Sequence, residues 1–415
     1  MPPLVIDKEK WKPCLDYLKF FVKWLLIAVV VGVIVGVIGA GFAHVLAWVN
    51  ALRAAYPKIT LGLPVGGLVI VWLYQVTKNT GDKGTNTIIE AVRGEAKTSF
   101  LTAPLIFVST AITHLFGGSA GREGAALQLG GSIAGAMGTV IRLSDEDRRI
   151  IVMCGMAAGF SALFGTPMAA AVFALEVACV GAVEYTALFP CVAASLVAHF
   201  VAEFLQVPPE VFHLSALPAM GLVGLLQVLA LAAAAAGVSV IFCLTMHKAE
   251  QLYKQFPNPY ARIAIGGILV LVMAAVWETG DYLGSGMGMI EHIFHSGEPV
   301  EVWAFLLKIV FTAATLGAGF KGGEIVPSFT IGAALGCVAG PWIGLPMELG
   351  AAIGMTAVFC GVTNCPITAL LISFELFGFE GMPWYLCAVA VSYLLSAKHS
   401  LYHVQNFRHS KLSMK

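Results

Sequence analysis

Long apolar segments interrupted by glycine-rich polar motifs occur in two matching series along this chain. Each series opens with an apolar segment of unusual length, residues 20–49 in the first and 217–246 in the second. Each later carries a glycine-rich motif that contains a glutamate, Glu123 or Glu324. Interrupted apolar segments at corresponding places of two halves are typical of transporters built from inverted repeats, whose substrate site lies at the repeat interface.

Hydrophobic residues make up 58% and charged residues 12% of the chain, against about 25% charged in soluble proteins. Long helical runs also exclude a membrane β-barrel, so we expect an all-α integral membrane protein.

The same pattern divides the chain into five parts. We expect an N-terminal cytoplasmic or interfacial helix over residues 1–17, a first membrane repeat over 18–206 and a linker over 207–216 that contains two consecutive prolines. A second, inverted membrane repeat follows over 217–398, and residues 399–415 form a C-terminal segment. Lysines at positions 8, 10, 12, 19 and 23 indicate that the N-terminus faces the cytoplasm.

The motif Gly117–Ala126 is the strongest functional signal in the first half. Its sequence GGSAGREGAA places Glu123 in the first turn of an apolar helix. Backbone N–H groups and the helix dipole make such a helix start attractive to an anion. A charge in the middle of a bilayer costs about 2.5–3.5 kcal/mol, so it rarely lacks a function. The alternative is a structural carboxylate that is stabilised by the dipole and paired with Arg122.

The second half repeats this arrangement in the motif Gly317–Pro327, which carries Glu324. The inverted repeat predicts that both glutamate-bearing helix starts converge on one site, where burial favours a neutral carboxyl that can carry a proton. A structural pairing of Glu324 with Lys321 is the alternative. Glu176 and Glu375 also occupy matching positions after a proline-broken helix, and for them we expect structural hydrogen bonds to neighbouring helix ends.

Several of these motifs resemble those of the CLC family of anion channels and anion/proton exchangers. The family signature Gly-Arg-Glu-Gly is intact as Gly121–Gly124, although Ala125 replaces the proline that usually follows. Residues 163–176 resemble the helix that follows the gate in that family. The resemblance covers roughly residues 20–402 and implies a CLC-type inverted repeat with many tilted and interrupted helices. It also implies that Glu123 is the gate and proton carrier, and that Tyr402 is an anion-coordinating tyrosine rather than an interfacial anchor.

The departures from the family pattern resemble its fluoride-selective bacterial branch. The serine-containing chloride loop is replaced by Gly84-Thr85-Asn86-Thr87-Ile88, and Gly322–Pro327 matches the Gly-Gly-Glu-x-x-Pro signature of that branch. The second of two consecutive glutamates, the inner proton relay of many exchangers, is here Val177. Thr85 departs from the methionine or asparagine that is common at the first coordinating position of the branch.

The sequence and this resemblance together predict a fluoride/proton antiporter that exports fluoride from the cytoplasm in exchange for entering protons. The alternative is a chloride/proton exchanger or passive anion channel of the same fold. Glu123 and Glu324 are the expected proton-linked carboxylates. The expected anion-binding residues are Thr85, Asn86, Gly121, Arg122, Gly124, Ala125, Gly323, Ile325, Val326 and Tyr402.

An enzyme is not expected, because the chain lacks the H-E-x-x-H motif and Ser119 has no evident histidine partner. No cofactor or metal is expected either, since the single His292 and His295 pair is too weak a signal for a metal site. The expected partners are fluoride, with chloride as the alternative, protons, the lipid bilayer and a second copy of the chain in a homodimer, without nucleic acid. The expected location is the plasma membrane, crossed several times, with both termini in the cytoplasm.

Overall fold

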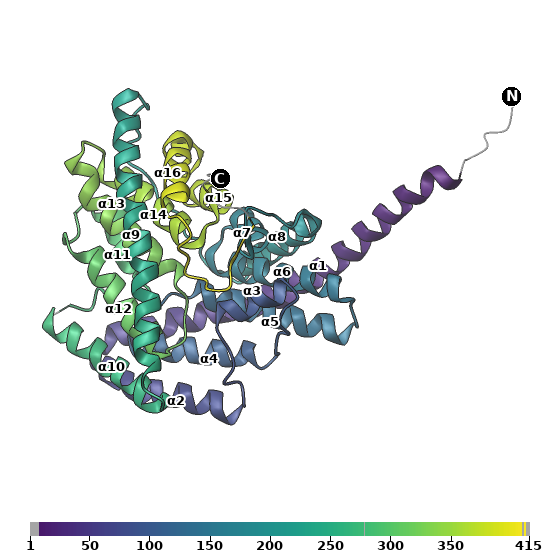
Figure 1. The fold of residues 1–415 in the computed structure, drawn as a ribbon, viewed down its shortest axis with the longest axis horizontal. Helices are drawn as coiled ribbons and strands as arrows, with labels where there is room; N and C mark the ends of the chain where they lie inside the picture. Colours follow the sequence, from purple (N-terminus) through teal and green to yellow (C-terminus); the bar gives the residue numbers. More distant parts are fainter. Residues whose placement is uncertain (1–7, 278, 409–410, 412–415) are drawn as a thin grey trace.

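The computed structural model describes residues 8–277, 279–408 and 411, and within them the chain is mostly helical, as predicted. The helices of the first half are α1 (Lys8–Ala55), α2 (Leu63–Val76), α3 (Thr85–Val92), α4 (Thr102–Leu115), α5 (Glu123–Val140), α6 (Asp145–Phe164), α7 (Pro167–Glu176) and α8 (Leu188–Phe204). The helices of the second half are α9 (Leu222–Lys254), α10 (Pro259–Val276), α11 (Met287–Ser296), α12 (Ala304–Ala318), α13 (Ile325–Trp342), α14 (Met347–Thr363), α15 (Pro366–Phe377) and α16 (Met382–Leu395). Figure 1 shows how these helices are arranged.

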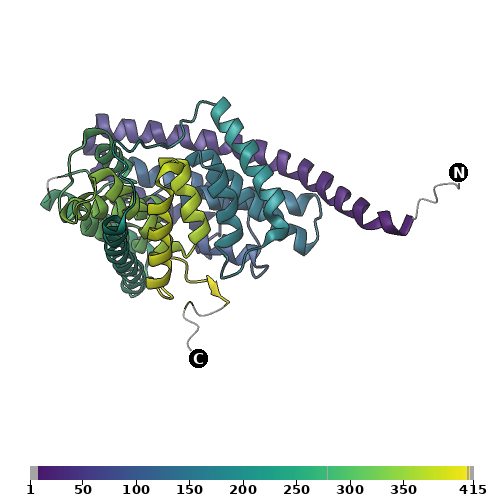
Figure 2. The same cartoon turned by 90° about the horizontal axis from the view of Figure 1, so that it is seen from above.

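Helix α1 differs in length from the sequence-based expectation. The described part of the expected N-terminal helix and the first apolar span form one continuous helix of 48 residues, so no helix end occurs near residue 17. The expected start of that N-terminal helix, residues 1–7, lies outside the described residues. At a rise of about 1.5 Å per residue, α1 is much longer than the roughly 30 Å hydrocarbon layer. Its first turns accordingly project beyond the other helices (Figures 1 and 2).

Six helical segments of the described chain are long and apolar enough to cross a membrane. They are residues 14–55, 57–76, 185–204, 222–254, 259–276 and 325–342. Most of the other apolar helices, including α4, α7, α12 and α15, have only 10–17 residues. Short helices inside a membrane protein end within protein-lined surroundings, where their free backbone groups need partners. Such ends are the places where this fold can hold an ion.

Glycines bring the helices of each half into close backbone contact. Gly130 of α5 packs directly against the carbonyl of Gly155 in α6, and Gly332 of α13 packs in the same way against the carbonyl of Gly354 in α14. A methyl group at any of these positions would collide with backbone atoms. Small residues permit this approach between membrane helices. The two contacts occupy matching places in the two halves. The same helix packing therefore occurs in the core of each half.

The C-terminal segment is tied back to the first half by a short parallel pairing. Strand β1 (Cys179–Val180) pairs with β2 (Asn406–Phe407), Cys179 opposite Asn406. The Gln405 amide donates hydrogen bonds to the carbonyls of Val177 (2.9 Å) and Thr363 (2.8 Å). These contacts fix the segment that carries Tyr402 in the interior.

Candidate functional site

The two glycine-rich motifs meet at the centre of the molecule. The N–H of Gly121 donates to the carbonyl of Gly323, and the N–H of Gly323 donates to the carbonyl of Gly121, both at 2.7 Å. This antiparallel bridge joins the two chain segments that open α5 and α13. The prediction that the two glutamate-bearing helix starts converge is therefore confirmed.

Glu123 is fully buried at the first position of α5. Its Oε2 accepts a hydrogen bond from the backbone N–H of Arg122 at 3.1 Å, and its Oε1 lies 3.5 Å from Arg122 Nε. Arg122 also binds Glu210 of the linker, with Nη2 and Oε1 2.5 Å apart. The pairing of Glu123 with Arg122 that the sequence offered as an alternative is thus present, but Arg122 divides its charge between two carboxylates.

Thr85 and Glu324 approach the start of α5 from the two halves of the chain. A methyl group built on Gly124 would lie 3.1 Å from Thr85 Oγ1, 3.3 Å from Glu324 Oε2 and 2.9 Å from Gly323 Cα. Only a glycine therefore leaves room at position 124, because three groups already surround its Cα. The glutamate that precedes α13 thereby lies next to the helix that Glu123 begins.

Several buried polar atoms around this point lack hydrogen-bond partners within the described part of the chain. They are Glu324 Oε2, Tyr402 Oη, Asn86 Oδ1 and Glu123 Oε1. Tyr402 is only 2% exposed, which places its hydroxyl in the interior rather than at a membrane surface. Buried polar groups nearly always have partners, so such a concentration indicates a site for a ligand or water. Ala125, Ile325 and Val326 are completely buried, and they contribute apolar side chains to the surroundings.

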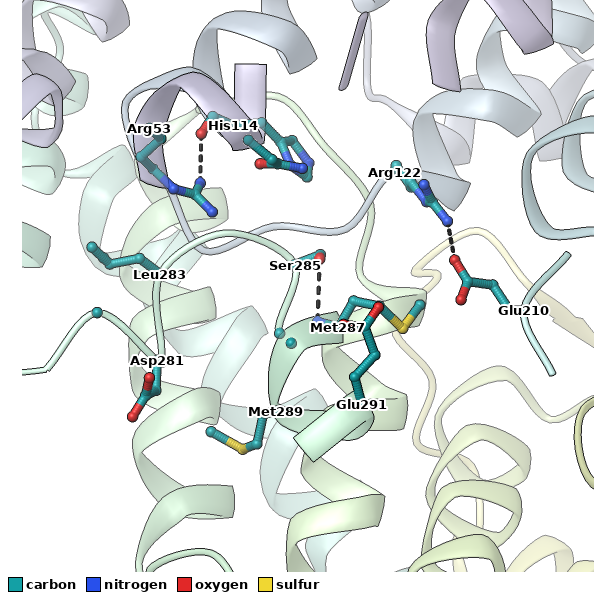
Figure 3. Close-up of a pocket in the computed structure, with 14 residues that line it drawn as sticks. Arg53, His114, Arg122, Glu210, Asp281, Leu283, Ser285, Met287, Met289 and Glu291 are labelled. Atoms are coloured by element: carbon teal, nitrogen blue, oxygen red, sulfur yellow. Dashed lines mark hydrogen bonds and ion pairs between the residues drawn. The ribbon is translucent and has the colours of Figure 1, made fainter. Parts of the chain in front are cut away.

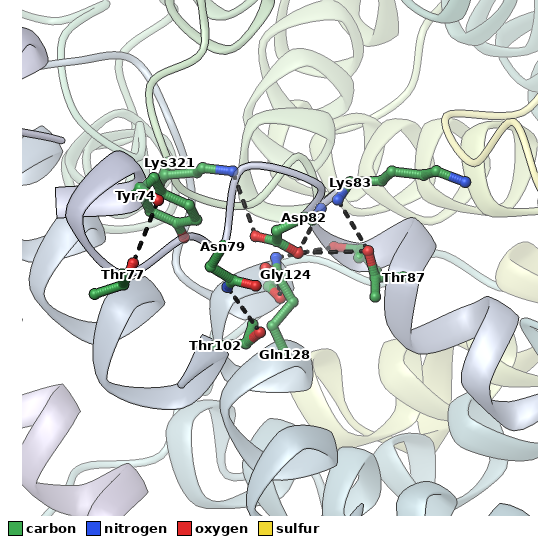
Figure 4. A network of polar contacts seen from close by, with 12 residues as sticks. Tyr74, Thr77, Asn79, Asp82, Lys83, Thr87, Thr102, Gly124, Gln128 and Lys321 are labelled. Carbon is green, nitrogen blue, oxygen red and sulfur yellow. Dashed lines mark hydrogen bonds and ion pairs between the residues drawn. The ribbon is translucent and has the colours of Figure 1, made fainter. Parts of the chain in front are cut away.

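A polar network holds the loop before α3 in place (Figure 4). Asp82 Oδ1 accepts hydrogen bonds from the N–H of Gly84 at 3.1 Å and from the Thr87 hydroxyl at 3.4 Å. Gly84 has a φ of +67°, which favours glycine and turns the chain sharply into Thr85. Lys321 Nζ lies 3.4 Å from Asp82 Oδ2 and 4.3 Å from the centre of the Tyr74 ring. The suggested pairing of Lys321 with Glu324 is therefore wrong, since Lys321 instead joins the second half to the α3 loop.

Gln128 is a site residue that the sequence analysis did not identify. Its Nε2 donates to the carbonyl of Gly124 at 3.1 Å and to Thr85 Oγ1 at 3.4 Å. Gln128 lies one helical turn after Gly124. This spacing from the Gly-Arg-Glu-Gly signature is the one feature of the sequence that could have identified it as a site residue. Gln128 thereby orients the threonine hydroxyl that faces the start of α5.

A cavity of about 390 Å³ leads to Arg122 and Glu210 (Figure 3). Its wall includes Arg53, His114 and the segment 280–291. The guanidinium of Arg53 donates to the carbonyl of His114 at 2.6 Å. The cavity gives the Arg122 side of the site access to solvent.

Glu176, at the end of α7, caps the start of α15, and Glu375, in α15, caps the start of α7. Glu176 accepts from the N–H groups of Ile367 and Thr368 at the start of α15, at 3.1 and 2.9 Å, and from the Thr368 hydroxyl at 2.7 Å. Glu375 accepts from the N–H groups of Met168 and Ala169 at the start of α7, at 2.8 and 2.9 Å. The prediction of structural hydrogen bonds to helix ends is confirmed for both residues.

The chain is similar to proteins of one family over nearly its whole length. The family model described as "Voltage gated chloride channel" matches residues 66–397. A "Chloride/fluoride channel protein" of Pseudomonas syringae pv. tomato is 37% identical over 96% of this chain and 89% of its own. A "Voltage-gated ClC-type chloride channel ClcB" of Escherichia coli is 25% identical over 93% of this chain and 99% of its own.

Solved structures agree with these matches. The crystal structure of a CLC-type fluoride/proton antiporter superposes with a TM-score of 0.89 at 34% identity, covering 93% of this chain and 98% of that one. A slow cyanobacterial Cl⁻/H⁺ antiporter superposes with a TM-score of 0.76 at 20% identity, covering 90% and 94%, which shows the shared fold. The chain therefore belongs to the voltage-gated chloride channel, or CLC, family of membrane transport proteins.

Proposed function

We propose that this protein is a fluoride/proton antiporter, which exports fluoride from the cytoplasm in exchange for protons that enter. The observation that carries the proposal is the meeting of Thr85 and Glu324 at Gly124, directly beside Glu123. Similarity to a chloride/fluoride channel protein and to a fluoride/proton antiporter supports it. In this proposal the protein acts as a transporter in the plasma membrane, as a homodimer with both termini in the cytoplasm.

The chemistry of the site suits a small, hard anion. Fluoride releases its water reluctantly and needs hydrogen-bond donors that replace that water. Backbone N–H groups at the start of α5, the hydroxyls of Thr85 and Tyr402 and the amide of Asn86 can serve as such donors. Gly121, Gly323, Ala125, Ile325 and Val326 complete the proposed site as close backbone and apolar surroundings, and Arg122 positions Glu123 rather than binding the anion.

Two carboxyl groups supply the proton coupling in this proposal. Glu123 competes with the anion for the start of α5 when it is charged, and leaves that place when it is protonated. Glu324 approaches the same glycine from the other half, and its Oε2 is buried without a partner among the described residues. Two carboxylates in a site with little water do not both ionise readily, so a proton is retained between them. A neutral carboxyl can donate a hydrogen bond to fluoride and later release its proton.

Reconstituted protein tests this function directly. We expect liposomes loaded with fluoride and chloride to release fluoride much faster through the protein, as followed with ion-selective electrodes. Weakly buffered vesicles should take up protons during fluoride efflux, and Glu123→Gln should abolish this uptake because glutamine keeps the shape but cannot titrate. Equal efflux of the two anions would favour the chloride/proton exchanger or passive channel, and undiminished proton uptake in the variant would remove Glu123 from its role.

A further inference from the structure

A cluster of titratable side chains lies at the end of α9, outside the site described above. His403 Nε2 and Glu250 Oε2 are 2.9 Å apart, and the other oxygen of Glu250 lies 2.7 Å from Lys254 Nζ. The ring of His403 stacks on that of His247 with centroids 3.9 Å apart. The side chains of His403 and Glu250 are 45% and 40% exposed. The cluster is therefore open to water on one side.

The other side of this cluster adjoins the central site. His403 follows Tyr402, whose buried hydroxyl has no partner within the described chain. The backbone of Glu250 packs against Gly317, where an added methyl group would lie 3.3 Å from Glu250 N. Gly317 lies near the end of α12 and is the first residue of the second glycine-rich motif, which carries Glu324.

The imidazole of histidine is suited to passing protons between this site and water. It changes charge between about pH 5 and 8, and its two nitrogens can accept a proton on one side and release one on the other. The Nε2 of the His403 ring and the Glu250 carboxylate are within hydrogen-bond distance, at 2.9 Å. Val177, which occupies the place of the inner proton relay in many exchangers, is apolar and completely buried. A route for protons to water must therefore use other residues.

We propose that His403 and Glu250 form the proton relay that connects Glu324 with the water on the face of the protein where α9 ends. This inference rests on the proposed antiport function. The Glu324 carboxyl loses its proton and becomes a carboxylate, the His403 imidazole accepts that proton and becomes an imidazolium, and water then takes the proton. Because the second half is inverted, α9 ends on the face where α1 begins, which is the cytoplasmic face in the orientation proposed above.

Other titratable groups surround the relay, and one of them provides a control variant. Lys254 and His247 face it from α9, His399 comes from the segment before Tyr402, and Lys321 lies on the side of Glu324. Like His403, His399 lies in the segment around Tyr402. Unlike His403, it forms no ion pair with the Glu250 carboxylate within 4.0 Å among the described residues. His399→Gln is therefore a matched control for His403→Gln.

The test measures proton uptake and fluoride efflux together in liposomes that contain the full-length protein. We expect His403→Gln and Glu250→Gln to lower the proton flux about tenfold or more, because a positioned acid or base speeds proton transfer by at least about a hundredfold. The fluoride flux should lose its dependence on the pH of the compartment that the relay faces. The His399→Gln variant should behave like the parent, and fluoride affinity measured by calorimetry should be the same in all variants.

A chemical rescue separates a relay from a structural role. Adding free imidazole should restore proton flux to His403→Ala, because the small molecule can occupy the vacated space and titrate as the side chain did. Parent-like coupling in both the His403 and Glu250 variants would overturn the relay. Slow variants with weakened fluoride affinity and no response to imidazole would also overturn it, since that pattern indicates a structural role. A parent protein that moves fluoride without protons would instead refute the antiport function, and the relay with it.

Discussion

The bridge between Gly121 and Gly323 gives a stringent test of the site, through the substitution Gly323→Ala. The added methyl group would lie 2.5 Å from the backbone nitrogen of Gly124, 0.9 Å short of the 3.4 Å at which ordinary contact begins. The three atoms nearest to this methyl group, Gly124 N, Gly124 Cα and Glu123 N, are all backbone, so the two motifs have to separate by about that distance. Overpacking of this kind costs about 1–3 kcal/mol, and losing two backbone hydrogen bonds adds about 0.5–1.5 kcal/mol each. The total is about 2–6 kcal/mol, concentrated where Glu123 and Glu324 meet.

The expected consequence for transport follows from this displacement. Moving reacting groups apart by about 1 Å typically costs a factor of about 100 in rate. We therefore expect the initial fluoride efflux of Gly323→Ala to fall by about that factor, in protein that still elutes as a single species in size-exclusion chromatography. Gly237→Ala in α9 is the control, because a methyl group there meets nothing within 4 Å. Fluoride efflux within about twofold of the parent would refute the reasoning.

Four other substitutions test separate parts of the structure. Glu324→Gln should impair proton-coupled fluoride transport in folded protein, and parent-like fluxes of both ions would make Glu324 only a structural helix cap. Glu176→Ala and Glu375→Ala should each lower stability by about 2–5 kcal/mol in thermal unfolding, because charge-assisted bonds to buried N–H groups are lost. Burial raises the pKa of Glu210 above its ordinary 4.5, although the Arg122 charge opposes this shift. The folded state therefore holds this proton more tightly, so stability should decline as pH rises from 4.5 through the folded pKa. Glu210→Gln should remove that slope, and an unchanged slope would contradict the assignment.

The sequence predicts the repeat and its consequences well, because both follow from local patterns that occur twice. Glycine-rich helix starts at matching positions imply the meeting of Gly121 with Gly323. The matching places of Glu176 and Glu375 imply structural hydrogen bonds to neighbouring helix ends, and the structure adds that each residue caps a helix of the other half. Tyr402 was expected in the interior from its resemblance to the family pattern alone, and its burial agrees with that expectation.

Contacts between segments far apart in the sequence were harder to predict. Lys321 lies three residues before Glu324, which suggested a local pair, but it reaches Asp82 in the first half instead. The pairing of His403 with Glu250 joins positions 153 residues apart and has no counterpart in a local motif. The continuity of α1 was missed because the lysines near its start resemble the polar end of a separate surface helix.

Glu176 of α7 caps the start of α15, and Glu375 of α15 caps the start of α7. These two equivalent contacts become possible at different times during synthesis. Glu176 is already present when α15 is made, whereas Glu375 follows Met168 by 207 residues. At about 5–20 residues per second, a ribosome needs on the order of 10–40 s to cover that distance. During this delay the first N–H groups of α7 have no carboxylate, and in lipid each unpaired group costs several kcal/mol. The first half of the transporter, although made first, can therefore complete α7 only after the second half has entered the membrane.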